Sequence, residues 1–179
     1  MLAQGSQNLS LVVSDHEITD TTLRCAQAIR THLNNKSGEV IFVCILKGAL
    51  FFFRDVLALF EDTNYEIDFC KLTSYSANNS TGKIDMQLPC QTDVNQKHVI
   101  VFEDIVDTGL SVDFLRSYFH AKNVKSLMIC ALLDKPEMRK ISVQVDFTGI
   151  TVPKAYLVGY GLDFNQKYRL LKGVYRIEK

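Results

Sequence analysis

Continuous apolar runs alternate along the chain with segments in which apolar residues recur at helical spacing. The runs from Val40 to Leu46 and from Ser126 to Leu133 contain no charged residue. Such runs are typical of strands that are buried on both faces. Shorter or less regular runs predict further strands over residues 99–103, 65–75 and 155–161.

Three segments between these runs have the 3.6-residue period of an amphipathic helix. The first contains Leu23, Ala26, Ile29 and Leu33, and Thr19-Asp20 offers it an N-cap. The others cover residues 49–61, after Gly48, and residues 111–121, where Val112, Leu115 and Phe119 share a face. Strands that alternate with helices predict an α/β fold with a mostly parallel central sheet.

The length of 179 residues suits a single domain. We predict a core over residues 36–150 and a small hood formed by residues 1–35 and 151–179, which fit the core pattern less cleanly. The polar segment 74–95 is too long for a routine connection, so we expect a flexible loop that closes over a site. The alternative is a surface excursion without function.

The composition argues against several classes of protein. Twenty basic and twenty acidic residues give a formal net charge of zero. This argues against a protein whose main function is to bind nucleic acid, because such binding needs a basic surface. The five cysteines form no CxxC pair, so free buried thiols are expected in a reducing compartment. No signal peptide and no membrane span are evident, which predicts a cytoplasmic protein without a membrane partner.

Charged residues follow four of the predicted strands. They are Lys47, the pair Glu103-Asp104, the pair Asp134-Lys135, and Asp163. In an open parallel sheet, ligands bind beyond the carboxyl ends of the strands. These residues are therefore expected to converge on one crevice.

The stretch Asp107 to Ser111 predicts a phosphate site, although the chain has neither a P-loop nor a GxGxxG motif after a strand. Gly109 permits a close backbone approach, and the N-terminus of the next helix favours an anion. Simple helix capping by Asp107 or Thr108 is the alternative. Glu103 and Asp104 suit a ribose diol or a hydrated magnesium ion, the alternative being a solvated turn.

Taken together, these motifs resemble the type I phosphoribosyltransferases, and among them the hypoxanthine-guanine branch. The similarity rests on EDIVDTGLS at 103–111, LKG at 46–48, SY at 74–75, DKP at 134–136 and YLVGYGLDFNQKYR at 156–169, and it spans about residues 10–178. It implies a Rossmann-like α/β fold with a hood. It also implies an enzyme of purine salvage that transfers the phosphoribosyl group of phosphoribosyl pyrophosphate to hypoxanthine or guanine, giving IMP or GMP and pyrophosphate.

The resemblance also implies roles for the sugar and phosphate side of the site. Asp107, the catalytic residue, would lie beside the imidazole ring of the purine, as a base or as a stabiliser of positive charge. The 5-phosphate would be bound by Asp107, Thr108, Gly109, Leu110 and Ser111. The pyrophosphate would be bound by Leu46, Lys47 and Gly48, whose Leu-Lys peptide is often cis in the family, and by Ser74, Tyr75 and Arg169.

On the purine side, the implied residues are Lys135, Tyr156, Leu157 and Asp163. Tyr156 stands where the family more often has Phe. The implied cofactor is Mg²⁺, near Glu103, Asp104 and Asp163. The partners would be the purine base, phosphoribosyl pyrophosphate and further copies of the chain in a dimer or tetramer. Two alternatives stay open: a xanthine-preferring or broad 6-oxopurine enzyme, and a related regulator that binds nucleic acid.

Overall fold

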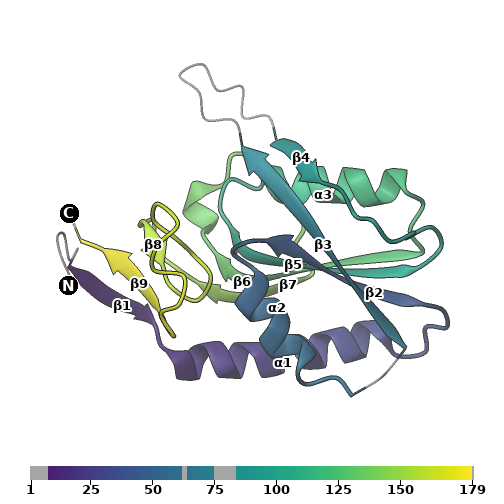
Figure 1. Ribbon diagram of the computed structural model, residues 1–179, viewed down its shortest axis with the longest axis horizontal. Helices are drawn as coiled ribbons and strands as arrows, with labels where there is room; N and C mark the ends of the chain where they lie inside the picture. The colour runs from purple at the N-terminus through teal and green to yellow at the C-terminus, as the bar shows by residue number, and fades with distance from the viewer. Residues whose placement is uncertain (1–7, 62–63, 75–83, 179) are drawn as a thin grey trace.

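The structure, a computed structural model, describes residues 8–61, 64–74 and 84–178. Its main sheet has six strands in the order β4-β3-β2-β5-β6-β7 (Figure 1). The strands are β2 (Val40–Leu46), β3 (Tyr65–Ser74), β4 (Ile84–Leu88), β5 (His98–Val106), β6 (Ser126–Asp134) and β7 (Phe147–Thr151). Only β4 is antiparallel to its neighbour, so the predicted mostly parallel sheet is confirmed.

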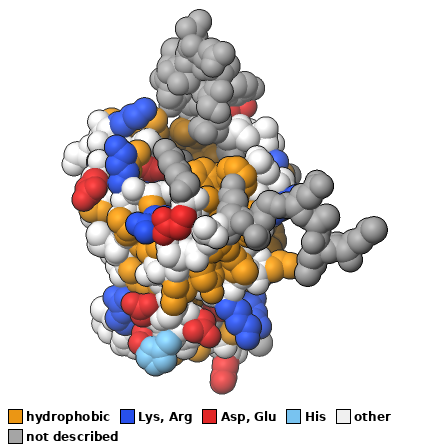
Figure 2. Space-filling model, turned by 90° about the vertical axis from the view of Figure 1, so that its left-hand side faces the viewer, with side chains coloured by type: hydrophobic (Ala, Val, Ile, Leu, Met, Phe, Trp, Pro, Cys, Tyr) orange, Lys and Arg blue, Asp and Glu red, His pale blue; other side chains and the backbone are white. Residues whose placement is uncertain are grey.

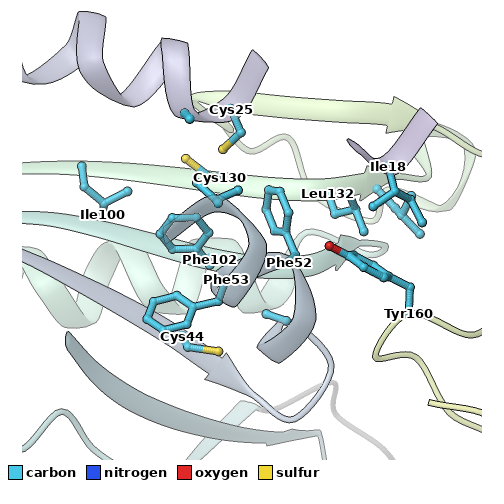
Figure 3. Close-up of a cluster of buried hydrophobic side chains, with 14 of the residues drawn as sticks. Ile18, Cys25, Cys44, Phe52, Phe53, Ile100, Phe102, Cys130, Leu132 and Tyr160 are labelled. Carbon is cyan, nitrogen blue, oxygen red and sulfur yellow. The ribbon is translucent and has the colours of Figure 1, made fainter. Parts of the chain in front are cut away.

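Helices cover both faces of this sheet. The first face carries α1 (Asp15–Leu33) and α2 (Leu50–Leu57), and the second carries α3 (Leu110–Ala121); a short 3₁₀ helix, η1 (Pro136–Met138), follows β6 (Figure 1). On the first face, the rings of Phe52 and Phe53 from α2 pack edge-on against Phe102 of β5 (Figure 3). This packing fixes α2 against the centre of the sheet, and with it residues 46–48, which precede the helix.

A second sheet forms the hood. Its order is β1-β9-β8, from strands β1 (Leu9–Val13), β9 (Val174–Ile177) and β8 (Leu157–Val158), and it lies beside the ends of the parallel strands (Figure 1). Both ends of the chain contribute to this smaller layer. On the face that carries it, hydrophobic side chains gather over the middle, where basic and acidic side chains interrupt them, and further charged side chains lie along the lower margin (Figure 2).

The margins of these layers differ from the predictions at three points. The strand predicted over 155–161 is reduced to Leu157–Val158; it pairs with β9 in the hood, to which residues 151–179 were assigned, and not with the parallel strands that its end was expected to join. The edge of the main sheet is formed by β7, whose partly polar sequence FTGIT was not recognised as a strand. In addition, α1 contacts α2 and the main sheet, although its residues were assigned to the hood.

The boundaries of α1 and β5 also differ from the predictions. Helix α1 begins after Ser14, which forms a capping box with Glu17, so the cap at Thr19-Asp20 is wrong. Leu23, counted on the buried face, is 51% exposed. Strand β5 does not end at the acids but continues through them to Val106, which places both carboxylates within the sheet.

The polar segment 74–95 is more regular than expected. Residues Ile84–Leu88 form β4, and the connection after it is held by buried Asp68 of β3. The carboxylate of Asp68 accepts hydrogen bonds from the backbone N–H groups of Gln91 and Thr92 at 2.8 and 2.7 Å and from the thiol of Cys90 at 3.0 Å. This half of the segment thus consists of a strand paired with β3 and a hydrogen-bonded connection, whereas the sequence predicted a flexible loop over the whole of residues 74–95.

We expect Asp68 to make stability depend on pH. Burial alone would raise its pKa, but hydrogen bonds from the N–H of Thr92, the thiol of Cys90 and the N–H of Phe69 lower the pKa to about 2 from 3.8. A lowered pKa stabilises the fold above about pH 4, by about 2 kcal/mol, and this contribution is lost as the pH falls towards 2.

Denaturant unfolding of the Asp68→Asn variant should therefore show a deficit at pH 7 that shrinks as the pH approaches 3. The Asp93→Asn variant is the control, because Asp93 is an exposed acid in the same connection. A deficit for Asp68→Asn that stays constant with pH would contradict the assignment.

The five cysteines, Cys25, Cys44, Cys70, Cys90 and Cys130, are all buried and free, which confirms that prediction. In the described ranges, no helix is long and apolar enough to cross a membrane.

Candidate functional site

A cavity of about 410 Å³ opens where the parallel strands end. It is lined by eight of the predicted site residues: Leu46, Lys47, Gly48, Glu103, Asp104, Ser111, Asp163 and Arg169. These residues come from the ends of β2 and β5, the start of α3 and the segment after β8. Segments that are far apart in the sequence thus share one cavity.

The segment from Leu46 to Gly48 packs closely against its neighbours. The peptide bond between Leu46 and Lys47 is cis. A Cβ atom on Gly48 would lie 1.5 Å from Oδ2 of Asp104, and one on Gly161 would lie 1.9 Å from the carbonyl oxygen of Gly48. Only glycine at both positions allows the segment to lie between β5 and the residues after β8.

The two adjacent acids of β5, Glu103 and Asp104, lie in surroundings that disfavour their charged forms. Glu103 is 6% exposed, and burial together with the charge of Asp104 raises its pKa well above the ordinary range. Burial also raises the pKa of Asp104 to about 6; the backbone N–H of Ile105 and the charge of Arg169 oppose this shift, while Asp163 adds to it. The alternative of a solvated turn is therefore wrong.

Cationic side chains lie against the same wall. Nη2 of Arg169 is 2.7 Å from Oδ1 of Asp163, and its Nη1 donates to the carbonyl of Gly161 at 2.6 Å. The side-chain oxygen of Gln166 accepts from both Lys47, at 3.1 Å, and Arg169, at 3.2 Å. Two cations that share one amide acceptor form a local positive region beside the acids.

The stretch from Asp107 to Ser111 has the geometry of an anion-binding loop. Gly109, at φ 89°, is the N-cap of α3, and no side chain of the described residues caps this helix; the nearest contact joins Thr108 Oγ1 and the N–H of Leu110 at 3.4 Å. The first-turn N–H groups thus stay available to an anion. This arrangement does not support the alternative of simple capping by Asp107 or Thr108.

Asp107 and Lys135 lie together at the edge of this loop. Nζ of Lys135 is 3.8 Å from Oδ2 of Asp107 and donates to the carbonyl of Ala155 at 2.8 Å. Oδ1 of Asp107 is buried and has no hydrogen-bond partner among the described residues. A buried oxygen that lacks a partner is costly, so Asp107 retains an unused acceptor beside a lysine.

The purine-side residues are not all in the 410 Å³ cavity. Tyr156 is 57% exposed and lines a separate hollow of about 530 Å³ with Phe164, whose ring it meets edge-on at 5.4 Å. Its hydroxyl donates to the carbonyl of Asp163 at 3.2 Å, which links the two regions. Leu157 is buried in β8. Tyr75 and the side chain of Ser74 lie outside the described residues.

Sequence reasoning missed several residues around the site. Thr73 and Ile84 line the cavity, and the hydroxyl of Thr73 is buried without a partner among the described residues. Arg139 contacts the backbone of Asp107. Nothing in the sequence distinguishes these residues from ordinary strand and loop positions, because their roles depend on contacts across the fold.

The acids of the cavity suit a magnesium ion only in part. Asp104 and Asp163 are close enough for the charge of Asp163 to raise the pKa of Asp104, and a divalent cation would relieve this repulsion. In the parts of the chain that the structure describes, however, no group of three or more His, Cys, Asp or Glu residues could hold a metal. Mg²⁺ commonly takes one or two carboxylates and completes its shell with water and substrate phosphates.

Comparisons with known proteins agree with this architecture. Residues 16–165 match the family model described as phosphoribosyl transferase domain. The chain is 32% identical to a hypoxanthine phosphoribosyltransferase of Buchnera aphidicola, with 91% of the chain and 92% of the relative covered. It is 35% identical to a hypoxanthine-guanine phosphoribosyltransferase of Streptococcus pneumoniae, with 90% and 88% covered.

A solved structure is also similar. The crystal structure of a hypoxanthine-guanine phosphoribosyltransferase from Bacillus anthracis superimposes with a TM-score of 0.86 at 30% identity, covering 94% of this chain and 98% of that one. The match extends over the hood as well as the main sheet, since so little of either chain is left out.

Proposed function

Because the chain belongs to the phosphoribosyl transferase family, we propose that it transfers the phosphoribosyl group of phosphoribosyl pyrophosphate to hypoxanthine or guanine. The products are IMP or GMP and pyrophosphate, and the reaction serves purine salvage. The observation that carries the proposal is the position of Asp107, the first residue of the anion-binding loop, whose carboxylate lies 3.8 Å from the amine of Lys135. A sugar phosphate and a heterocycle can then meet at one carboxylate.

The phosphate groups of the substrate are bound from two sides. The N-terminus of α3, with the hydroxyls of Thr108 and Ser111, binds the 5-phosphate. Lys47 and Arg169, which line the same cavity as Ser111, bind the pyrophosphate. Positive charge that is already in place stabilises the leaving group as the glycosidic bond breaks.

Magnesium is the proposed cofactor. Asp104 and Asp163, with Glu103 next to Asp104, would hold the ion together with substrate oxygens. When bound, it neutralises charge on the pyrophosphate. The ribose hydroxyls are oriented by Glu103 and Asp104, whose carboxylates accept hydrogen bonds.

Lys135 recognises the purine. Its amine can only donate hydrogen bonds, so it matches the 6-oxo group of hypoxanthine or guanine and opposes the 6-amino group of adenine. Tyr156 stacks on the base, and main-chain groups of Leu157 and Asp163 face its 2-position. Asp107 accepts the purine proton or stabilises charge on the sugar.

The direct test is an assay of the purified protein with phosphoribosyl pyrophosphate and each of four bases: hypoxanthine, guanine, xanthine and adenine. We expect turnover of hypoxanthine or guanine, none of adenine, and loss of activity when EDTA removes Mg²⁺. Preferred turnover of xanthine would favour the broad 6-oxopurine alternative. No turnover of any base, together with tight binding of RNA or DNA, would favour the regulator alternative and overturn the proposal.

The Lys135→Ala variant tests base recognition. Loss of a charged hydrogen bond costs about 1.5–3 kcal/mol, so KM for hypoxanthine should rise roughly 10- to 100-fold and discrimination against adenine should weaken. Lys97→Ala is the control, because Lys97 forms ion pairs with Glu39 and Glu66 outside the cavity. Unchanged selectivity among the bases in Lys135→Ala would remove Lys135 from base recognition.

We also propose a homo-oligomer, a dimer or tetramer. Light scattering of the purified protein at assay concentration measures this directly, and a monomeric mass would contradict it.

A further inference from the structure

Arg139 is a partly buried cation just outside the cavity. It follows η1, and its side chain is 20% exposed. Its Nη1 donates to two successive carbonyl oxygens, those of Val106 and Asp107, each at 2.6 Å. Its Nη2 forms an ion pair with Asp134 at the end of β6. The carboxylate of Asp134 balances the charge of the guanidinium and holds it in place.

These two carbonyls belong to the peptide groups on either side of the Cα atom of Asp107. A guanidinium that binds both of them fixes both peptide planes, and therefore the φ and ψ angles of Asp107. The direction of a Cα–Cβ bond follows from these angles. Arg139 thus sets the direction in which the side chain of Asp107 leaves the backbone, without touching its carboxylate.

Backbone N–H groups from the same segment hold the carbonyls on either side of that of Asp107. The N–H of Lys135 donates to the carbonyl of Val106 at 2.9 Å, and the N–H of Lys140 donates to the carbonyl of Thr108 at 3.0 Å. Among the described residues, however, only Arg139 donates to the carbonyl of Asp107. The segment after β6 therefore supports three successive residues of the loop, and at the central one it does so through a single side chain.

We propose that Arg139 is a positioning residue for phosphoribosyl transfer, which acts by fixing the backbone of Asp107. This proposal rests on the proposed function. An arginine is suited to the role because its rigid planar guanidinium binds both carbonyls through Nη1 while Nη2 is anchored by Asp134, whereas a lysine amine is a single point of charge on a flexible stem. Small misplacement of a reacting group costs up to 10²-fold in rate.

The first test compares Arg139→Ala and Arg139→Lys with matched variants of Arg116. Arg116 is 21% exposed, pairs with Asp146 at 2.6 Å and donates to the carbonyl of Gln144, away from the cavity. We expect kcat to fall roughly 10- to 100-fold in Arg139→Ala, with partial recovery in Arg139→Lys, while KM for phosphoribosyl pyrophosphate changes little. Guanidinium ion at millimolar concentration should restore part of kcat in Arg139→Ala only.

A double-mutant cycle separates positioning from general stability. If Arg139 acts through Asp107, adding Arg139→Ala to Asp107→Asn should lower kcat by less than 3-fold further, rather than by the full factor. Additive losses, or equal losses in the Arg116 variants, would overturn the proposal.

The final measurement does not depend on turnover. NMR order parameters for the amides of residues 107–109 should fall in Arg139→Ala and stay unchanged in Arg116→Ala. An inactive wild-type protein would refute the proposed function, whereas unchanged order parameters in Arg139→Ala would refute the positioning role.

Discussion

Replacing Asp107 by Asn is expected to lower kcat by roughly 10²-fold or more, with at most a few-fold change in KM for phosphoribosyl pyrophosphate. The change keeps the shape of the side chain but replaces one acceptor oxygen by an amide that only donates. Asp107 has one oxygen without a partner among the described residues and the other 3.8 Å from Lys135. A carboxylate in this state can accept a proton or offset positive charge, and Asn can do neither.

Initial rates at varied phosphoribosyl pyrophosphate and saturating hypoxanthine measure this effect. The Asp113→Asn variant is the control, since it removes an exposed acid from the first turn of α3, next to the same loop. Thermal unfolding of both variants shows whether they remain folded. A normal kcat in Asp107→Asn would exclude Asp107 from catalysis, and a change confined to KM would make it a binding residue.

The Gly161→Ala variant is expected to lose about 10²-fold in kcat/KM for phosphoribosyl pyrophosphate. Gly161 has a φ of 99°, and an added Cβ would lie 1.9 Å from the carbonyl oxygen of Gly48. Gly48 is itself packed closely against the carboxylate of Asp104, which leaves it little room to move. The methyl group would therefore displace the segment that carries Asp163 and Arg169. The two ends of this segment are joined by the hydrogen bond from the N–H of Gly161 to the carbonyl of Arg169, at 3.0 Å.

Gly38→Ala provides a matched control. Gly38 also has a positive φ, 129°, but an added Cβ would meet no atom closer than 3.4 Å. Both variants should lose stability, by about 1–3 kcal/mol, because alanine is strained at such φ values. Only Gly161→Ala should lose activity beyond this, as measured by steady-state rates below the unfolding temperature. Equal activity in the two variants would show that the close approach of Gly161 to Gly48 is not needed.

The hydrophobic pattern predicted the centre of the fold well and its margins poorly. Strand β2 has the predicted bounds, and β6 and α3 differ by one residue at one end. Strands buried on both faces must be apolar throughout, and this signal is local. The strand predicted over 155–161 is shorter than expected, and its pairing with β9 was not predicted, because a short apolar run does not specify the strand with which it pairs. The cap at Ser14 was detectable, since Ser14 and Glu17 have capping-box spacing.

The sequence by itself determined which residues could carry the chemistry: the charged and hydroxyl-bearing residues near the ends of β2, β5 and β6, in the order and spacing of a known family. The tertiary structure decided what surrounds them. It buried Glu103 within a strand, left one oxygen of Asp107 without a partner among the described residues, and brought Arg139 to the carbonyl of Asp107. Local sequence fixes side-chain type and secondary structure, whereas burial and approach between distant segments depend on how the sheets and helices pack together.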